Sequence, residues 1–156
     1  MENKLLATKA AMAAAASAVL SFLGWKGALG LAWILVMALD YLSGTIAAMK
    51  DGDWASGKAR EGLAHKGGMI FVVVVAGISD WIMALILPNI PGLGIQWPGL
   101  VLPLVLAWYI LTELGSILEN AVKLGAPVPP WLIKILKISK DAVEHAGDSA
   151  ESPETT

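Results

Sequence analysis

The sequence predicts an all-α integral membrane protein, and three observations support this prediction. Of the 156 residues, 56% are hydrophobic and 15% are charged, a balance that is typical of membrane proteins. The apolar residues fall in runs of about twenty, long enough to cross a bilayer core of roughly 30 Å as a helix. These runs lack the alternation of barrel strands, and open strands cannot satisfy their backbone hydrogen bonds in lipid. Helices are therefore the expected structure.

We expect four transmembrane helices within residues 1–120, at about residues 5–25, 27–49, 67–87 and 98–118. The first is mostly alanine, which favours a helix but adds little hydrophobicity per residue. The second is rich in large apolar residues and ends before Lys50, while a turn at Pro88-Asn89 closes the third.

The first apolar run has an alternative interpretation as a cleaved signal peptide. Lys4 and Lys9 precede a short apolar stretch within it, and Ala16-Ser17-Ala18 is compatible with a cleavage site. Against this, the run is nearly all alanine, and its removal would leave an odd number of spans. A mature N-terminus at Val19, detected by mass spectrometry, would overturn the four-span topology.

Basic residues indicate which face of the membrane is cytoplasmic. The loop at residues 50–66 carries four of them, whereas the connection at residues 88–97 carries no charged residue. We therefore expect the loop to be cytoplasmic and the connection external. An even number of crossings then places both termini in the cytoplasm, and Lys26, in a very short turn, is the exception on the external side.

Three acidic residues lie within the predicted spans: Asp40 near the middle of the second, Asp80 about two turns from the outer end of the third, and Glu113 near the inner end of the fourth. A carboxylate at such depth is unfavourable unless it is protonated, paired or hydrated. The three acids form a polar track across the membrane if the helices line one cavity. Alternatively, each is hydrogen-bonded inside a packed bundle, which is favoured for Glu113.

Small residues accompany the first of these acids. Asp40, Gly44 and Ala48 are four residues apart and therefore share one helix face, where another backbone could approach closely. Such a face favours helix association, within one chain or between chains.

The segments outside the spans are expected to contact the membrane surface. In the loop, Lys58, Arg60 and Lys66 are predicted to lie there. Residues 121–146 are expected to form a proline-rich turn and an amphipathic helix in the cytoplasmic interface, with Trp131 on its apolar face and lysines toward anionic headgroups. The alternative is docking of that apolar face onto the bundle or a neighbouring subunit. The surface lysines of the helix are Lys134 and Lys137.

The acidic tail at residues 147–156 is expected to be disordered.

Composition excludes several classes of site. The chain has no cysteine, which excludes disulfides, thiolate nucleophiles and cysteine-ligated zinc. His65 and His145 are too far apart for a recognisable metal motif, and no nucleophile–base pair or phosphate-binding glycine motif occurs. We therefore expect no catalytic, cofactor or metal site. A net charge of −2 also argues against a nucleic-acid partner.

Two blocks of sequence resemble a known family. The first is Asp40-Tyr41-Leu42-Ser43-Gly44, followed by Gly62-Leu63-Ala64-His65-Lys66 before a hydrophobic span. The second is Glu113-Leu114-Gly115-Ser116-Ile117-Leu118-Glu119-Asn120, followed by Gly125-Ala126-Pro127-Val128-Pro129. In order and spacing, over residues 25–140, they resemble the signature of the bacteriophage lysis and toxin-secretion holins, which include clostridial toxin-release proteins.

The resemblance implies a non-enzymatic homo-oligomer in the lipid of the host cytoplasmic membrane. It implies lesions that release a cytoplasmic peptidoglycan hydrolase (an endolysin) or a toxin. Two alternatives stay open: a small transporter or ion channel that uses the intramembrane acids, and a structural membrane subunit whose C-terminal helix recruits a partner. The candidate residues for the pore or its assembly are Asp40, Gly44, Asp80, Glu113, Glu119 and Asn120.

Overall fold

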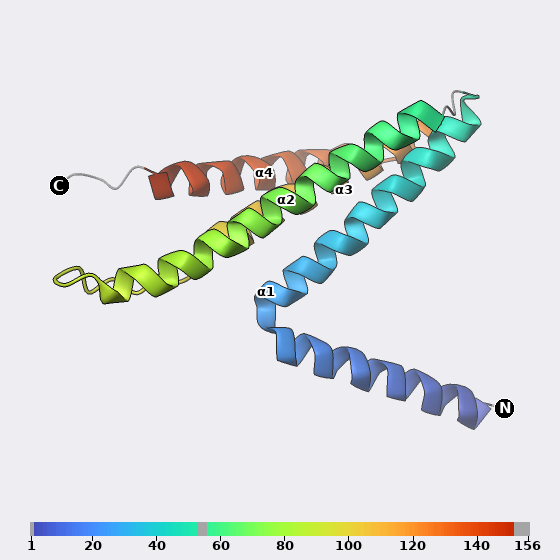
Figure 1. Cartoon of the computed structure of the whole chain (residues 1–156). Helices are drawn as coiled ribbons and strands as arrows, with labels where there is room; N and C mark the ends of the chain where they lie inside the picture. Colours follow the sequence, from blue (N-terminus) through green and yellow to red (C-terminus); the bar gives the residue numbers. More distant parts are fainter. Residues whose placement is uncertain (1, 53–55, 152–156) are drawn as a thin grey trace.

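A computed structural model of the chain describes residues 2–52 and 56–151, with the side chains of residues 5–7, 9, 14, 24–52 and 62–149. Every regular element in these residues is helical (Figure 1). The elements are α1 (Glu2–Lys50), α2 (Ser56–Ile86), the 3-10 turn η1 (Leu87–Asn89), α3 (Val101–Lys123) and α4 (Pro130–Glu151).

The long helices run between two ends of the molecule. At the basic end, α1 finishes at Lys50 and α3 at Lys123, and the Lys50 ammonium donates a 3.0 Å hydrogen bond to the Lys123 carbonyl. At the far end, the Lys26 ammonium donates a 3.0 Å hydrogen bond to the Pro98 carbonyl, just before α3 begins. The part of α1 after Gly24 is therefore parallel to α3, and the two are tied together near both ends.

Three helices are long and apolar enough to cross a membrane: Gly24–Lys50, Gly62–Asn89 and Val101–Lys123. They confirm the second, third and fourth predicted spans as helices of membrane-spanning length. The boundaries differ in two places. Helix α3 continues past residue 118 because Glu119 and Asn120 extend the helix rather than end it, and α2 begins at Ser56, inside the predicted loop. The first predicted span falls mostly on residues whose side chains lie outside the described ones, so it remains a prediction.

A sharp bend at Gly24 separates the alanine-rich part of α1 from the rest. The sequence predicts a short turn between residues 25 and 27, but the structure changes direction at one residue, with φ 64° and ψ −172°. This conformation is essentially restricted to glycine, because a Cβ would clash with the backbone. In Figure 1 the segment before Gly24 points away from the other helices.

Replacing Gly24 with alanine is expected to destabilise the fold or straighten the bend, since an L-residue held in this backbone region costs about 1–3 kcal/mol. Gly30 provides the control, because it lies on the same helix without a positive φ and an added Cβ would meet no atom within 4 Å. Gly30→Ala is expected to be neutral or stabilising. Thermal unfolding in detergent, followed by circular dichroism, distinguishes the two; equal behaviour of both variants would contradict the assigned role of the bend.

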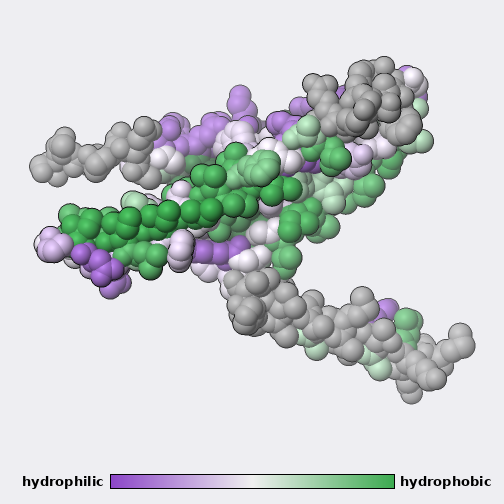
Figure 2. Space-filling view, viewed as in Figure 1, coloured by the Kyte–Doolittle hydropathy of each residue, from purple (hydrophilic) through white to green (hydrophobic). Residues whose placement is uncertain are grey.

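The buried core is small and the apolar surface is large. Trp33, Met69 and Leu106 form the core, with the Trp33 and Tyr109 rings stacked 6.3 Å apart. Most other large apolar side chains point outward, such as Phe71 with 74% of its surface exposed. Figure 2 shows this apolar surface along α2 and a hydrophilic one along α4. The exposed apolar surface is suited to lipid or to neighbouring copies rather than to water.

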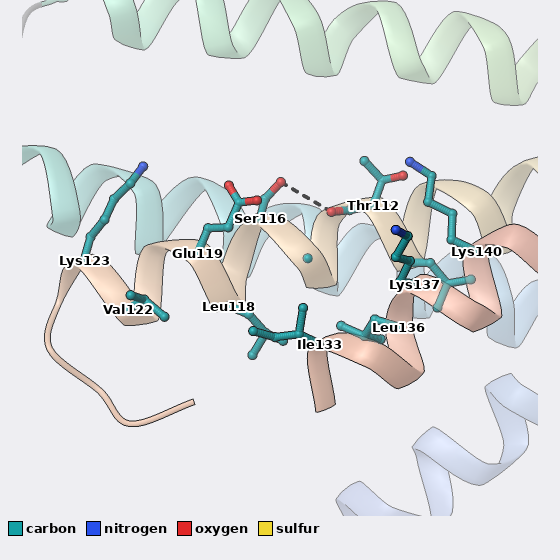
Figure 3. A pocket seen from close by; sticks show the side chains of 12 residues that line it. Thr112, Ser116, Leu118, Glu119, Val122, Lys123, Ile133, Leu136, Lys137 and Lys140 are labelled. Carbon is teal, nitrogen blue, oxygen red and sulfur yellow. Dashed lines mark hydrogen bonds between the residues drawn. The ribbon is translucent and has the colours of Figure 1, made fainter. Parts of the chain in front are cut away.

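Helix α4 folds back beside α3, in the opposite direction. The indole Nε1 of Trp108 donates a 2.8 Å hydrogen bond to Glu144, and the Lys140 ammonium lies 4.4 Å from the centre of the Trp108 ring. Nearer the basic end, Ile133 and Leu136 line a cavity of about 580 Å³ between the two helices (Figure 3). The structure thus has α4 against the bundle, the second of the two arrangements that the sequence left open.

The acidic tail is a correction to the sequence prediction. Residues 147–151 continue α4 as helix, although residues 147–156 were predicted to be disordered. Alanine at 146 and 150 favours helix, and the Ser149 hydroxyl donates to the His145 carbonyl within the last turns. The last five residues, 152–156, lie outside the described ones.

Candidate functional site: a polar network between three helices

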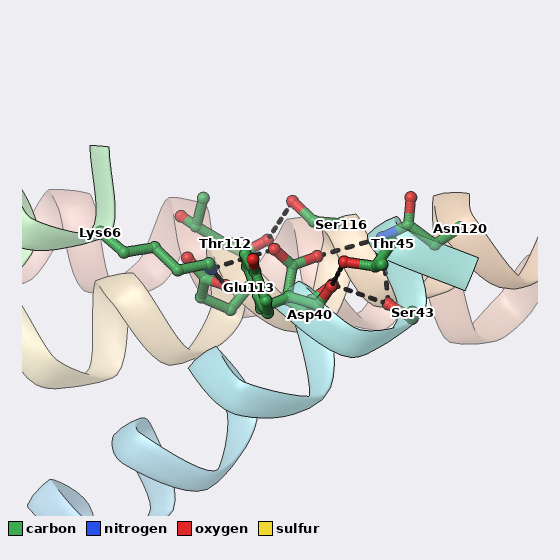
Figure 4. A network of polar contacts seen from close by, with 9 residues as sticks. Asp40, Ser43, Thr45, Lys66, Thr112, Glu113, Ser116 and Asn120 are labelled. Atoms are coloured by element: carbon green, nitrogen blue, oxygen red, sulfur yellow. Dashed lines mark hydrogen bonds and ion pairs between the residues drawn. The ribbon is translucent and has the colours of Figure 1, made fainter. Parts of the chain in front are cut away.

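One polar network joins α1, α2 and α3 inside the apolar bundle (Figure 4). The Lys66 ammonium lies 3.0 Å from Asp40 Oδ2 and 2.5 Å from Glu113 Oε2. The three side chains are 13%, 18% and 6% exposed, for Lys66, Asp40 and Glu113 in that order. Each residue lies ten positions from the basic end of its helix, a depth of about 15 Å along the helix axis. The chain therefore places one cation and two acids at a single level.

Asn120 and Ser43 complete the network on the side of α1 and α3. The Asn120 amide donates to Asp40 Oδ1 at 3.2 Å and to the Ser43 hydroxyl at 3.0 Å. Ser43 in turn donates to the Asp40 carbonyl at 3.1 Å. Both carboxylate oxygens of Asp40 thus accept a hydrogen bond, one from Lys66 and one from Asn120, as buried carboxylates require.

The charges of the network do not cancel. One ammonium balances one of the two carboxylates, so the fully ionised cluster carries a single negative charge. Burying such a charge in an apolar environment is unfavourable unless a proton, a second cation or water compensates it. The network can therefore hold three helices together in a packed chain, and it becomes more favourable when water reaches it.

Gly44 allows α1 and α3 to approach each other at this level. A Cβ at Gly44 would lie 3.4 Å from the Asn120 amide nitrogen. We expect Gly44→Ala to be tolerated with a small shift of Asn120, and Gly44→Leu to separate the helices and break the Asn120 contacts. Gly30→Leu, at an open position on the same helix, is the matched control. Thermal unfolding in detergent should give the order Gly30→Leu, then Gly44→Ala, then Gly44→Leu in decreasing stability, and a Gly44→Leu chain as stable as the control would contradict the close approach.

Asp80 lies at the far end, away from this network. Its Oδ1 accepts hydrogen bonds from the Trp97 indole at 2.8 Å and the Val101 amide at 3.0 Å, and its Oδ2 accepts one from the Leu102 amide at 2.9 Å. The carboxylate of α2 thereby satisfies two of the free N–H groups at the start of α3, where the helix dipole also favours negative charge. The side chain is buried, at 8% exposed.

The predicted site residues therefore separate into three places. Asp40, Gly44, Glu113 and Asn120 come together in the network, Asp80 caps α3, and Glu119 is exposed beside the cavity between α3 and α4. Because Asp40 and Glu113 share one level, a single chain contains no track of acids at three depths.

The structure corrects the surface role that the sequence predicts for Lys66. The sequence places it in the cytoplasmic loop with Lys58 and Arg60, but α2 begins before it and turns its ammonium toward two acids. The signal available in the sequence was charge balance: two acids within spans require a cation, and Lys66 directly precedes a long apolar run. Ser43 was quoted only as part of a motif. The side chains of Lys58 and Arg60 lie outside the described ones.

The three predicted surface residues of the C-terminal segment, Trp131, Lys134 and Lys137, are all exposed on α4. Their exposure agrees with contact to headgroups but equally with the side-by-side packing of α4 and α3, so their membrane-surface role stays a prediction.

Comparison with known proteins gives one family and several relatives. A model of the bacteriophage holin family matches residues 17–141. An uncharacterised protein of Halalkalibacterium halodurans is 32% identical over 82% of this chain and 90% of its own length. An uncharacterised protein of Clostridium perfringens strain 13 is 31% identical, over 67% of this chain and 69% of its own. A 14.9 kDa protein from the nagH 3′ region of Clostridium perfringens is also 31% identical, over 67% and 70%. No solved structure matches the chain.

Proposed function

Because the chain belongs to the bacteriophage holin family, we propose that it oligomerises in the bacterial cytoplasmic membrane and opens lesions that release a cytoplasmic endolysin or toxin. It is a multi-pass membrane protein with three apolar helices of membrane-spanning length. The observation that carries the proposal is the network of Asp40, Lys66 and Glu113, an unbalanced charged cluster inside helices whose other surfaces are apolar.

The proposed lesion forms when packed copies of the chain admit water. In the packed state the network is sealed between α1, α2 and α3, and exposed apolar side chains face lipid or other copies. Clustering of copies removes lipid from these surfaces and brings several charged networks close together. Repulsion between their uncompensated charges then favours hydration, so that a dry cluster converts to a wet one.

We further propose the topology that the basic residues favour. The structure supports it by gathering Lys50 and Lys123 at one end, opposite the uncharged connection at residues 88–97. In this topology the basic end faces the cytoplasm, and the alanine-rich part of α1 before Gly24 forms a fourth span.

The proposal is tested by inducing the gene in bacteria with and without a co-expressed cytoplasmic peptidoglycan hydrolase. Membrane potential, viability and turbidity are recorded together. We expect an abrupt loss of potential and viability in both cultures, and a fall in turbidity only where the hydrolase is present. Ion-dependent conductance without loss of viability would instead indicate a transporter or channel, and unchanged permeability would indicate a structural subunit.

A variant of the network tests the mechanism separately. Asp40→Leu removes one acid and balances the charge of Lys66 and Glu113, and it is expected to delay or abolish lysis at equal membrane levels. Leu42→Ala, at an exposed position two residues away, serves as the control. Lysis by Asp40→Leu and by Asp80→Leu on the normal schedule would show that neither of these acids has a part in lesion opening and would contradict the mechanism.

A further inference from the structure

We propose that α3 and α4 together form the wall of the aqueous lumen of the lesion, with α4 crossing the membrane beside α3 in the open assembly. This inference rests on the proposed function and adds which surface of the chain meets the water. It is carried by the depth at which α4 packs, by the polar side chains in the second half of α3 and by the charged face of α4.

Helix α4 lies at membrane depth in the structure. Trp108 is seven residues into α3, about 10 Å from the far end of that helix. Its contacts with Glu144 and Lys140 therefore bring charged residues of α4 well inside the length of a membrane-spanning helix. Charged side chains at that depth do not face hydrocarbon; in membrane proteins they face the bundle interior or a water-filled cavity.

The side of α3 next to α4 carries a row of polar side chains over the second half of the helix. Thr112, Ser116, Glu119 and Lys123 follow the spacing of one helix face, and all four line the cavity between the helices. Figure 3 shows Thr112 near Lys137 and Lys140 of α4, with Ser116, Glu119 and Lys123 following along α3. We call this set, together with Lys137 and Lys140, the polar wall. The cavity floor is apolar, with Leu118, Ile133 and Leu136 holding the two helices together.

Helix α4 has three distinct faces that suit this position. Leu132, Leu136 and Val143 are partly buried on the face toward the bundle. A second face exposes Trp131, Ile135 and Ile138, at 62%, 51% and 56%, and matches lipid or a neighbouring copy. The third carries charges of both signs, which are exposed except for the half-buried Lys140: Lys134, Lys137, Lys140, Asp141 and Glu144.

A helix that lay only in the membrane interface would need two faces, one for lipid and one for water. Helix α4 joins α3 through its partly buried face and through Lys140 and Glu144 at the edge of the charged face, while Lys134, Lys137 and Asp141 stay exposed. The turn between the helices, with Gly125 at φ 92° followed by three prolines within residues 126–130, fixes where α4 leaves α3.

The absence of cysteine from the sequence makes the polar wall directly testable. Single cysteines are placed on the wall, as Ser116→Cys and Lys137→Cys, and off it on the same helices, as Ala121→Cys and Ile135→Cys. The purified chains are incorporated into dye-loaded vesicles and treated with a charged, membrane-impermeant thiol reagent. Because thiols react as thiolates, which need water, wall positions are expected to react about tenfold or more faster than off-wall positions once dye release begins.

A second measurement tests whether α4 stays beside α3. A chain with both Ser116→Cys and Lys137→Cys is bridged by a short, reducible bifunctional thiol reagent, since both positions line one cavity. We expect the bridged chain to continue to release dye. Loss of release that a reductant restores would show that α4 must leave α3, and would overturn the inference.

The remaining outcomes are also decisive. If vesicles leak but wall positions react no faster than off-wall positions, the lumen is formed elsewhere and the inference is wrong, while the proposed function stands. If the unmodified protein releases no dye at any density in the membrane, the proposed function fails and this inference fails with it.

Discussion

Replacing Lys66 with methionine is expected to destabilise the folded chain by about 3–5 kcal/mol, because removal of one partner from a buried ion pair leaves an uncompensated charge. Here two carboxylates, Asp40 and Glu113, lose their shared cation at once. Methionine keeps the side chain up to its fourth atom and lacks only the ammonium, so the loss mainly reflects charge rather than a cavity. Thermal unfolding of the purified protein in detergent measures the effect, and membrane levels in cells should fall in parallel.

Two further variants separate charge from packing. Lys123→Met removes an exposed lysine at the end of α3 and is expected to change stability little. The triple variant Lys66→Met, Asp40→Asn, Glu113→Gln replaces the charged cluster with uncharged side chains and is expected to recover most of the stability. A Lys66→Met chain that melts with the unmodified protein would show that the network contributes nothing to the fold.

Replacing Asp80 with leucine is expected to produce the second large loss, because three donors lose their acceptor. Each buried donor left without a partner costs about 1–3 kcal/mol, and the donors here are the amides of Val101 and Leu102 and the indole of Trp97. We expect the first turn of α3 to fray and Trp97 to become mobile. Hydrogen exchange at the start of α3 and the fluorescence of the detergent-solubilised chain report these changes.

Asp80→Asn is the graded control, since an amide keeps one oxygen acceptor but loses the charge that complements the helix dipole. It should fall between the unmodified chain and Asp80→Leu. Asp51→Leu, an exposed acid just beyond α1, should have little effect. Protection of the first α3 amides that is unchanged in Asp80→Leu would contradict the capping role.

Most of the fold follows from the hydropathy of the chain, but its boundaries do not. Runs of apolar residues predict four spans, and the structure has three of them as helices of membrane-spanning length, since length and hydropathy decide whether a helix can cross lipid. The extension of α2 back to Ser56 was missed because residues 56–66 are polar, and polarity does not distinguish a surface loop from the solvated first turns of a long helix. The position of α4 beside α3 depends on tertiary packing, and the periodicity of the sequence does not indicate what the apolar face of a helix contacts.

The sequence predicts the two acids of the network but not its cation. A carboxylate inside an apolar run stands out, so Asp40 and Glu113 are found from the sequence. Lys66 sits at the edge of such a run, where lysine is ordinary, and only the arrangement of three helices reveals its two partners. The sequence identifies Asp80 as an acid within a span but not as the cap of α3. Its partners include two backbone amides, and the sequence does not indicate which amides lack a partner in their own helix.

The central place of α3 has a consequence for how the chain enters the membrane during synthesis. Helices α1 and α2 pack mainly on α3 and only lightly on each other. Since the ribosome delivers the chain from its N-terminus, both are made before the helix that joins them. In the folded chain Asp40 and Lys66 form a pair of balanced charge between these two lightly packed helices, without a residue of α3. The arrival of Glu113 on α3 then ends the balance, so the same helix that completes the bundle also introduces its surplus charge.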